Sequence, residues 1–296
     1  MNRNKIIITG ATGFIGSNLV RFLVNKGFDI GIIIRSTSEM DILSDVKKNL
    51  KILYYDGNIE QIIQFFEIEK PSIVIHTASN FLSQHNPSDI NSLIDSNIKF
   101  GTHILEAMRV SGVENLINTG TSWQHYDNEE YNPVCLYAAT KEAYQKLIDY
   151  YTSAENFKAI TLKLFDTYGE TDRRLKIINL LDKFSRNGGE LEMSYGEQLL
   201  NLTHVNNILD AFNIAIQLIH SKEDKGHQIY SLSSATNHSL KKVVEIFEKA
   251  TDRRINIVWG AREYRKREVM FPWNKGVPLP GWSERISLEE GLQKFK

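Results

Sequence analysis

The chain has 296 residues, 42% of them hydrophobic and 24% charged, which is the composition of an ordinary globular protein with ample material for a core. Its net charge of −1 excludes a bulk electrostatic attraction to nucleic acid or to a membrane surface. Cys135 is the only cysteine, so no disulfide can form within the chain, and this favours a reducing compartment.

A short polar stretch leads directly into an apolar, strand-like run, which leaves no room for a signal peptide. No segment approaches the roughly 18 uninterrupted apolar residues of a membrane-spanning helix. The eight histidines show no paired ligand spacing, so we expect no metal site. These patterns predict a cytoplasmic protein that binds no nucleic acid, no membrane and no metal.

Short β-rich runs alternate with helical patterns through the first half of the chain. Their near-continuous Ile, Val and Leu predict strands buried on both faces of a parallel sheet. Helices between such strands imply right-handed crossovers and an α/β doubly wound, Rossmann-type fold. The expected strands are residues 5–9, 30–34, 51–55, 72–76, 115–118 and 159–164, and the expected helices are residues 14–26, 88–110 and 137–151.

The regular alternation ends after Asp166. Residues 1–167 are expected to form a dinucleotide-binding domain. A further helical pattern and the strand-like run QIYSLSS indicate that residues 203–234 return to that domain. Residues 168–202 and 235–296 are then predicted to form a smaller C-terminal substrate-binding lobe.

The first strand ends in TGATGFIG, which places Gly10, Gly13 and Gly16 at G-x-x-G-x-x-G spacing ahead of a helix. Glycines here permit a tight turn, close approach of the backbone to a pyrophosphate, and close packing of helix on strand. The helix N-terminus presents N–H groups and a partial positive charge to the phosphates. The motif predicts a dinucleotide site; the alternative is a structural turn.

The end of the second strand, GIIIRSTS, bears on the choice between NAD and NADP. NAD-selective sites commonly have an acid there that bonds the ribose 2′-hydroxyl, but this sequence has Ile34. Arg35 can pair bidentately with a 2′-phosphate, and Ser36 can add a hydrogen bond. The sequence therefore predicts NADP(H); the alternative is that Arg35 is a solvated loop residue.

The stretch LYAATK places Tyr137 and Lys141 four residues apart, on one face of an expected helix. A neighbouring cation lowers a tyrosine pKa from its ordinary value of about 10, which makes the phenol a candidate proton donor and acceptor. An ordinary amphipathic helix can show the same spacing, so other motifs must decide.

A series of motifs in order resembles the extended short-chain dehydrogenase/reductase family of nucleotide-sugar epimerases, dehydratases and 4-ketoreductases. They are TGATGFIGSNLV, IVIHTAS, SNIKFGTHILEA, NTGTSW, LYAATK, KLFDTYG and LTHVNNI. The stretches NTGTSWQHY, KLFDTYGETDRR and REVMFPWNKGVPLPGW are similar to the branch containing CDP-paratose and CDP-abequose synthases, and to dTDP-4-keto-6-deoxyhexose reductases. In that branch NADPH reduces the 4-keto group of a nucleotide-linked 6-deoxysugar.

The resemblance implies catalytic roles for three residues. Tyr137 is expected to give its proton to the carbonyl oxygen at C4 as hydride arrives from the nicotinamide. Lys141 is expected to bond the nicotinamide ribose and hold the tyrosine pKa down. Thr121, rather than its neighbours Thr119 and Ser122, is expected to bond the substrate carbonyl.

Further cofactor contacts follow from the same resemblance. Asn97 is expected to help position the catalytic lysine. Asn58 stands where the family usually has an aspartate that bonds the adenine amino group, and an amide oxygen can accept that bond. The other expected cofactor contacts are Phe14, Ile15, Ile59, Ala78, Thr119 and Leu164.

The expected substrate contacts depart from the family pattern. Leu200 replaces an arginine that pairs with the substrate diphosphate in related epimerases, and Asp166 replaces an asparagine, where a carboxylate would repel phosphate. We therefore expect Arg174 or Arg267 to hold the phosphates. Ser122, next to Thr121, is a further expected substrate contact.

The resemblance implies NADPH-dependent reduction of a CDP- or dTDP-linked 4-keto-6-deoxyhexose in deoxysugar and surface polysaccharide (O-antigen) biosynthesis. A 4,6-dehydratase needs an Asp-Glu pair after the catalytic threonine, where this chain has Ser122 and Trp123. An NAD-dependent 4-epimerase is the alternative, and a non-catalytic NADP-binding regulator is the second. The motifs do not specify the nucleotide, the sugar or the C4 stereochemistry.

The family commonly dimerises through the two long helices, so a homodimer is expected. The outer faces of these helices include Tyr144, Leu147 and Tyr151, which could equally be core residues.

Overall fold

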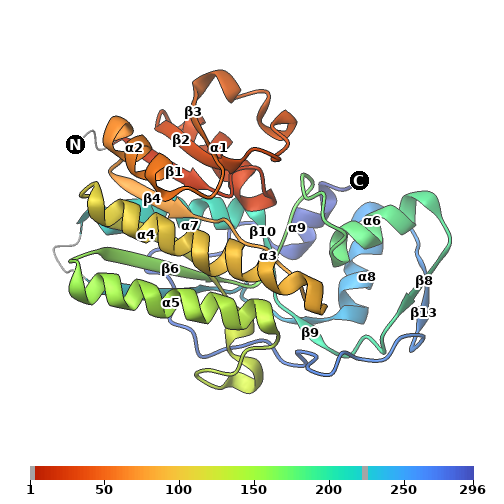
Figure 1. Ribbon diagram of the computed structural model, residues 1–296. Coiled ribbons are helices and arrows are strands. Elements are labelled where there is room, and N and C mark those ends of the chain that lie inside the picture. The colour runs from red at the N-terminus through yellow and green to blue at the C-terminus, as the bar shows by residue number, and fades with distance from the viewer. Residues whose placement is uncertain (1–3, 222–225) are drawn as a thin grey trace. The chain divides into compact units, whose positions relative to one another are not determined.

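The computed structural model describes residues 4–221 and 226–296 (Figure 1). Among these residues the largest sheet has seven strands in the order β11-β6-β5-β4-β1-β2-β3, so the order reverses at β1. The strands are β1 (Lys5–Thr9), β2 (Asp29–Arg35), β3 (Leu50–Tyr55), β4 (Ile73–His76), β5 (Asn115–Thr121), β6 (Lys158–Leu164) and β11 (Gly226–Leu232).

The strands from β3 through β2, β1 and β4 to β5 pair in parallel register. Ile6, Ile7 and Ile8 of β1 are fully buried, as expected of a strand that is covered on both faces. The prediction of a doubly wound parallel sheet is therefore confirmed. The carboxyl ends of β1 and β4 lie at the point where the strand order reverses, which is where open α/β sheets bind ligands.

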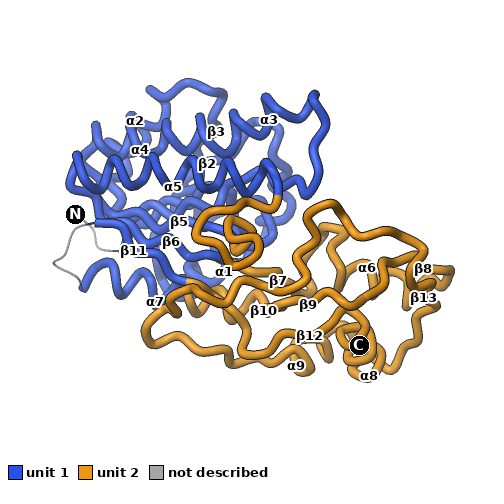
Figure 2. Tube along the Cα trace, turned by 90° about the horizontal axis from the view of Figure 1, so that it is seen from below, with its two compact units in different colours: residues 1–121, 135–163, 212–230 blue, residues 122–134, 164–211, 231–296 orange. Residues whose placement is uncertain are grey.

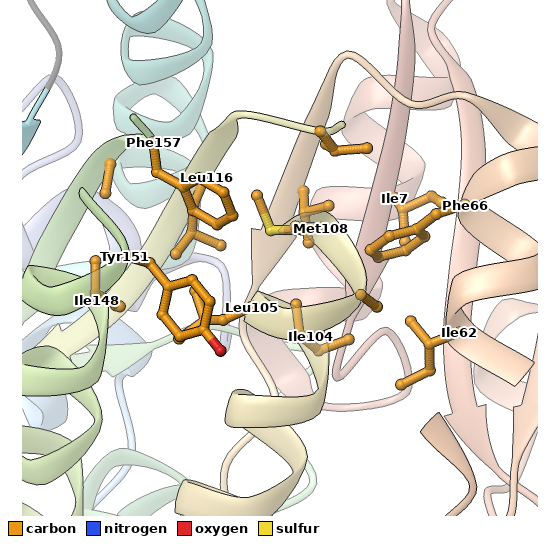
Figure 3. Packing of buried hydrophobic residues seen from close by; sticks show 14 of the residues in the cluster. Ile7, Ile62, Phe66, Ile104, Leu105, Met108, Leu116, Ile148, Tyr151 and Phe157 are labelled. Atoms are coloured by element: carbon orange, nitrogen blue, oxygen red, sulfur yellow. The ribbon is translucent and has the colours of Figure 1, made fainter. Parts of the chain in front are cut away.

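Helices α2 (Ile59–Glu69), α4 (Phe100–Val110) and α5 (Leu136–Ala154) pack their apolar sides into one buried cluster with residues of β1, β2, β4, β5 and β6 (Figure 3). Gly101 lets α4 approach α5 closely, because a Cβ at this position would lie 2.3 Å from the ring of Tyr144. Tyr144 is fully buried within unit 1. It is therefore a core residue, and not part of an outer helix face available to a partner.

The helix expected over residues 88–110 is interrupted. A 3-10 turn at Pro87–Asp89 and helix α3 (Ile90–Ile94) precede a π-helical turn at Asp95–Lys99, and α4 follows. The backbone N–H of Asn86 donates to the Asp89 carboxylate at 2.8 Å, which places the start of this segment before residue 88. Single π-turns inside helices are frequent at functional sites.

Helix α1 (Phe14–Asn25) lies close to the limits expected from the sequence, and α7 (Val205–Ser221) forms at the further helical pattern within residues 203–234. The strand expected in QIYSLSS is β11, which begins earlier, at Gly226. The sequence patterns did not predict α2, which occupies the connection between β3 and β4.

The chain divides into two compact units (Figure 2). Unit 1 comprises residues 1–121, 135–163 and 212–230, and unit 2 comprises residues 122–134, 164–211 and 231–296. The domain limits expected from the sequence stay a prediction, because compact units need not be domains that fold independently.

Unit 2 contains short strand pairs and three helices around its own apolar core. The pairs are β7 (Asp166–Tyr168) with β10 (Leu202–His204), β8 (Glu190–Met193) with β13 (Asn256–Trp259), and β9 (Leu199–Leu200) with β12 (His238–Ser239); the helices are α6 (Ile177–Asn187), α8 (Leu240–Thr251) and α9 (Leu288–Gln293). The side chains of Ser239 and Ser287 cap α8 and α9. Across the described ranges of both units, no helix has the length and apolarity needed to cross a membrane.

Candidate active site

Two glycines where β1 leads into α1, one in the connecting turn and one in the first turn of the helix, leave no room for side chains. Gly10 has a φ of +69°, and a Cβ there would lie 2.6 Å from the backbone nitrogen of Ala78. A Cβ on Gly16 would lie 2.1 Å from the carbonyl oxygen of Gly10. Gly13 is exposed at the N-terminus of α1, whose first turn has no acidic residue. The turn therefore offers a helix end suited to an anion at close range.

A cavity of about 750 Å³ in unit 1 adjoins this turn, within the size range of small-molecule sites. Five of the predicted cofactor residues line it, namely Gly10, Gly13, Arg35, Ser36 and Ala78. The cavity has further lining residues that the sequence patterns did not indicate, among them Thr12, Thr37, Ser38, Tyr55, Asp56, Ser79, Asn80 and Lys99. The roles of Phe14, Ile15, Ile59, Thr119 and Leu164, which are not among the lining residues, stay predictions.

Arg35 ends β2 with an exposed side chain on the wall of this cavity. Its backbone N–H donates to the Ser38 hydroxyl at 3.2 Å, and its carbonyl accepts from the Ser38 N–H at 3.0 Å. These two bonds close a short turn, and Ser36, Thr37 and Ser38 line the same cavity as Arg35. Such a loop suits a phosphate group.

Asn58 acts locally as the cap of α2, because its Oδ1 accepts from the Glu60 N–H at 3.0 Å. The neighbouring Asp56 lines the cavity, and its carboxylate accepts from the Asn58 N–H and from the Gln61 side chain, both at 3.0 Å. The adenine contact assigned to Asn58 stays a prediction, and Asp56 is a second candidate that the family pattern alone did not indicate.

Asn97 lies in the π-helical turn and is only 2% exposed. Its Oδ1 accepts from the Asn80 N–H at 2.7 Å and from the Ser79 hydroxyl at 3.2 Å. Its Nδ2 donates to the Asn80 carbonyl at 3.0 Å and to the Thr140 hydroxyl at 2.9 Å. One amide thus joins a loop that lines the cavity of unit 1 to the first turn of α5.

Helix α5 carries Tyr137 and Lys141 in its first two turns. The Phe81 ring meets the half-buried Tyr137 ring edge to face, with 5.0 Å between centroids. Lys141 is 3% exposed, and within residues 4–221 and 226–296 its ammonium has no hydrogen-bond or ion-pair partner. Burial lowers the pKa of Lys141 to about 8.

His76, at the end of β4, adds no charge to this region. Its Nδ1 lies 2.9 Å from the Thr9 hydroxyl, and burial, followed by the charge of Lys141, lowers the pKa of His76 to about 3. The hydroxyl of Thr119 donates to the His76 carbonyl at 3.2 Å, so its proton is engaged between strands. Thr121 lies at the carboxyl end of β5 and is 8% exposed.

A second cavity, of about 40 Å³, lies in unit 2. Ser122 and Asp166, both predicted to contact substrate, line it together with several aromatic rings. The Trp273 indole stacks on the His125 ring at 4.0 Å and lies parallel to the Phe165 ring at 6.3 Å between centroids. This volume is enough for a few water molecules or a small substituent. The three rings lie in the stretches NTGTSWQHY, KLFDTYGETDRR and REVMFPWNKGVPLPGW, but no sequence pattern predicts their contact, because they meet only in the folded chain.

Asp166 does not stand as an isolated negative charge. Its carboxylate pairs with Lys176 at 3.4 Å, at the N-terminus of α6. The Arg174 guanidinium makes bonds of 2.8 and 2.7 Å to the buried carboxylate of Asp172. Neither ion pair was predicted from the sequence.

Arg267 has a different environment in unit 2. Its guanidinium lies over the Tyr126 ring, 4.3 Å from the centroid, and donates to the side chain of Asn132. Its Nε is buried and has no hydrogen-bond partner among the residues that the structure describes. Arg267, one of the two arginines predicted to contact phosphate, thus has one N–H that no described residue accepts.

The chain is similar to known proteins along most of its length. Residues 6–232 match the family described as the NAD dependent epimerase/dehydratase family. The chain belongs to this family. It is 28% identical to a CDP-abequose synthase of Yersinia pseudotuberculosis, with 90% of this chain and 91% of the relative covered. It is 26% identical to a CDP-abequose synthase of Salmonella muenchen, with 98% and 96% covered. The family and branch resemblance predicted from the motifs is confirmed.

Solved structures of other proteins share the fold of this chain. A UDP-glucose-4-epimerase from Stenotrophomonas maltophila, with bound NAD and formylated UDP-arabinopyranose, has a TM-score of 0.86 at 16% identity and covers 98% of this chain and 97% of its own. A UDP-glucose 4-epimerase from Thermotoga maritima with UDP-glucose has a TM-score of 0.84 at 18% identity, with 98% and 96% covered. These likenesses show a common architecture.

Proposed function

We propose that this enzyme uses NADPH to reduce the 4-keto group of a CDP- or dTDP-linked 4-keto-6-deoxyhexose. One observation carries the proposal: a buried ammonium with no protein partner in the described residues, Lys141, lies one helical turn after Tyr137. A buried cation is costly unless a ligand provides its hydrogen bonds. The likeness to CDP-abequose synthases supports this class of reaction over others in the family.

The residues of unit 1 fit a dinucleotide, because Gly10 and Gly16 leave space for no side chain where a pyrophosphate would meet the end of α1. Lys141 would bond the nicotinamide ribose, and Arg35 with Ser36 would bond a 2′-phosphate. When bound, NADPH supplies the hydride for the sugar carbon.

The protein's own side chains supply the proton and the charge stabilisation. Tyr137 would transfer its phenolic proton to the C4 oxygen, which completes the alcohol once C4 has gained hydride. The Lys141 ammonium would stabilise the phenolate that remains, and the Thr121 hydroxyl would donate to the same oxygen as its charge develops. The phenolate then regains a proton from solvent.

The substrate phosphates need a cation that is not already fully paired. Arg267 keeps an unused buried Nε, whereas the Arg174 guanidinium is engaged by Asp172. We therefore favour Arg267 as the phosphate ligand. Lys176 offsets the charge of Asp166, which removes the repulsion expected from that carboxylate. Ser122 and the aromatic rings around it would contact the sugar.

An NAD-dependent 4-epimerase is the second candidate, favoured by a UDP-glucuronate 4-epimerase of Thermodesulfobacterium geofontis that is 26% identical over 97% of this chain. It would use the same Tyr137 and Lys141 but leave no net oxidised cofactor. A non-catalytic NADP-binding regulator would have no need of a buried lysine beside a tyrosine. The homodimer, the cytoplasmic location and the O-antigen pathway stay predictions.

A substrate panel tests the proposal. Purified protein is mixed with NADPH and, in turn, with CDP-, dTDP- and GDP-linked 4-keto-6-deoxyhexoses, and NADPH absorbance and sugar products are followed. We expect one mole of NADPH oxidised per mole of 4-hydroxy product with one of these sugars. Interconversion of 4-epimers without net loss of NADPH would establish the epimerase instead.

Arg35→Ala is expected to weaken NADPH binding by about 10- to 100-fold, because a charge-assisted hydrogen bond contributes about 1.5–3 kcal/mol. NADH lacks the 2′-phosphate, so its affinity should change little. Fluorescence titration of both cofactors measures the two dissociation constants, and Arg21→Ala, which removes a guanidinium that pairs with Asp45, is the matched control. Equal losses for the two cofactors would remove the 2′-phosphate role.

NADPH affinity is expected to fall as the pH rises through about 8, because Lys141 then loses the proton whose charge strengthens its bonds to the ribose. We expect an affinity about 10- to 100-fold lower at pH 10 than at pH 7. Lys141→Met should bind more weakly with no such dependence. Burial also lowers the pKa of Lys163 to about 8, so Lys163→Met is the control and should retain the pH dependence.

A further inference from the structure

The hydroxyl of Thr140 occupies a junction in unit 1. It donates to the backbone carbonyl of Tyr137 at 2.7 Å and accepts from the Nδ2 of Asn97 at 2.9 Å. Thr140 is 2% exposed, and it directly precedes Lys141 in the chain. One buried oxygen therefore connects the carbonyl of the tyrosine to an amide that is itself fixed by a second segment.

The other side of the junction is equally constrained. The Asn97 Oδ1 accepts two hydrogen bonds, from the Asn80 N–H and the Ser79 hydroxyl, and its Nδ2 donates two, to the Asn80 carbonyl and to Thr140. These bonds use the full donor capacity of the amide, so its orientation is determined. Ser79 and Asn80 both line the nucleotide cavity.

Lys141 depends on this junction for its position. Its ammonium makes no hydrogen bond or ion pair to the protein in the described ranges, so only the backbone of α5 and the surrounding packing determine where the charge lies. The first turn of α5 is joined to the cavity loop through Thr140 and Asn97. If that hydrogen bond is lost, a buried Asn97 N–H is left without a partner, and the turn can move to relieve it.

We infer that Thr140 is a positioning residue, whose hydroxyl sets the placement of Tyr137 and Lys141 relative to the nucleotide loop. As far as it concerns catalysis, this inference rests on the proposed function. Thr140 itself touches no reacting atom. It acts through Tyr137, whose carbonyl accepts its hydrogen bond, and through Lys141, which follows it in the chain.

The test compares Thr140→Val, which keeps the shape and removes the hydroxyl, with Thr140→Ser, which keeps the hydroxyl. In Thr140→Val we expect kcat with the keto sugar identified by the panel to fall about 10- to 100-fold. The KM for that sugar should change less than about threefold. We also expect the pH at which NADPH affinity falls to move from about 8 towards the ordinary lysine value near 10.4, because a loosened turn admits water to Lys141. Thr140→Ser should retain native values of both.

Thr152→Val is the matched control. Thr152 lies on the same helix, and its hydroxyl makes the same kind of bond, to the Asp149 carbonyl three residues earlier at 3.0 Å. It should change neither kcat nor the pH dependence. If Thr140→Val does not fold, Thr140→Ala replaces it with the same expected shift.

Two results would overturn the inference: native kcat and pH dependence in the variant without the hydroxyl, or an equal loss in Thr140→Ser. The pH dependence of NADPH affinity is measured without any sugar. It therefore still tests Thr140 if the wild-type protein reduces none of the sugars, an outcome that would reject the proposed function alone.

Discussion

Tyr137→Phe is expected to lower kcat by about 10²- to 10⁴-fold, the usual contribution of a positioned general acid. The phenolic hydroxyl is the proton source for the C4 oxygen, and phenylalanine removes only that group. The edge-to-face contact with Phe81, 5.0 Å between ring centroids, needs no hydroxyl and should persist. NADPH affinity should therefore stay within about threefold of the native value, since hydroxyl removal leaves Arg35 and Lys141 in place.

Stopped-flow absorbance of NADPH, with the sugar identified by the panel, measures the chemical step, and fluorescence titration measures cofactor affinity. Tyr144→Phe is the matched control, because Tyr144 lies on the same helix and donates to the Gly101 carbonyl at 3.3 Å inside the core of unit 1. It should lose at most about 1 kcal/mol of stability and no activity. A near-native rate in Tyr137→Phe would reassign the proton donor.

Gly16→Ala is expected to abolish measurable NADPH binding, a loss of about 100-fold or more. The added methyl would lie 2.1 Å from the Gly10 carbonyl oxygen and 2.8 Å from the Gly10 carbonyl carbon, and both are backbone atoms that cannot rotate away. Helix α1 must therefore shift from the end of β1, which moves its N–H groups out of reach of a pyrophosphate. Overpacking of this kind also costs about 1–3 kcal/mol of folding stability.

Gly112→Ala is the control that separates the loss of NADPH binding from the loss of folding stability. Gly112 has a φ of +66°, but a Cβ there would meet no atom within 4 Å, so the substitution adds backbone strain alone. We expect a loss of about 1 kcal/mol in the free energy of unfolding and native NADPH affinity. Thermal unfolding and cofactor titration of both variants make the comparison, and native cofactor affinity in Gly16→Ala would contradict the assigned role of this turn.

The parts of the fold that depend on local pattern could be predicted from the sequence. Strand β1 has the limits expected from its run of isoleucines, and α1 ends one residue before the expected limit. The glycine motif was predictable because its spacing marks positions where the backbone leaves no space for a side chain. Gly10 and Gly16 are two such positions in the structure. These features depend on the local sequence alone, so they can be predicted without knowledge of tertiary contacts.

The features that could not be predicted arise from contacts between distant segments. The π-helical turn places Asn97 against Asn80 and Thr140, and a helical periodicity does not reveal one extra residue in a turn. The ion pair between Asp166 and Lys176 offsets a negative charge that, from the sequence alone, was expected to repel the substrate phosphate. Helix α2 is an exception, because its cap is local: Asn58 directly precedes it, but that residue was interpreted only as an adenine ligand.

The interleaving of the two units in the chain has a practical consequence for protein engineering. The path changes unit after Thr121, Val134, Lys163, Ala211 and Tyr230. No single cut in the gene can therefore release either unit whole: a fragment ending at residue 121 lacks β6 and β11, and any longer one carries pieces of both cores. Because the proposed sugar and phosphate contacts Ser122 and Arg267 lie in separate segments of unit 2, replacing that unit by a relative's would require exchanging several segments at once.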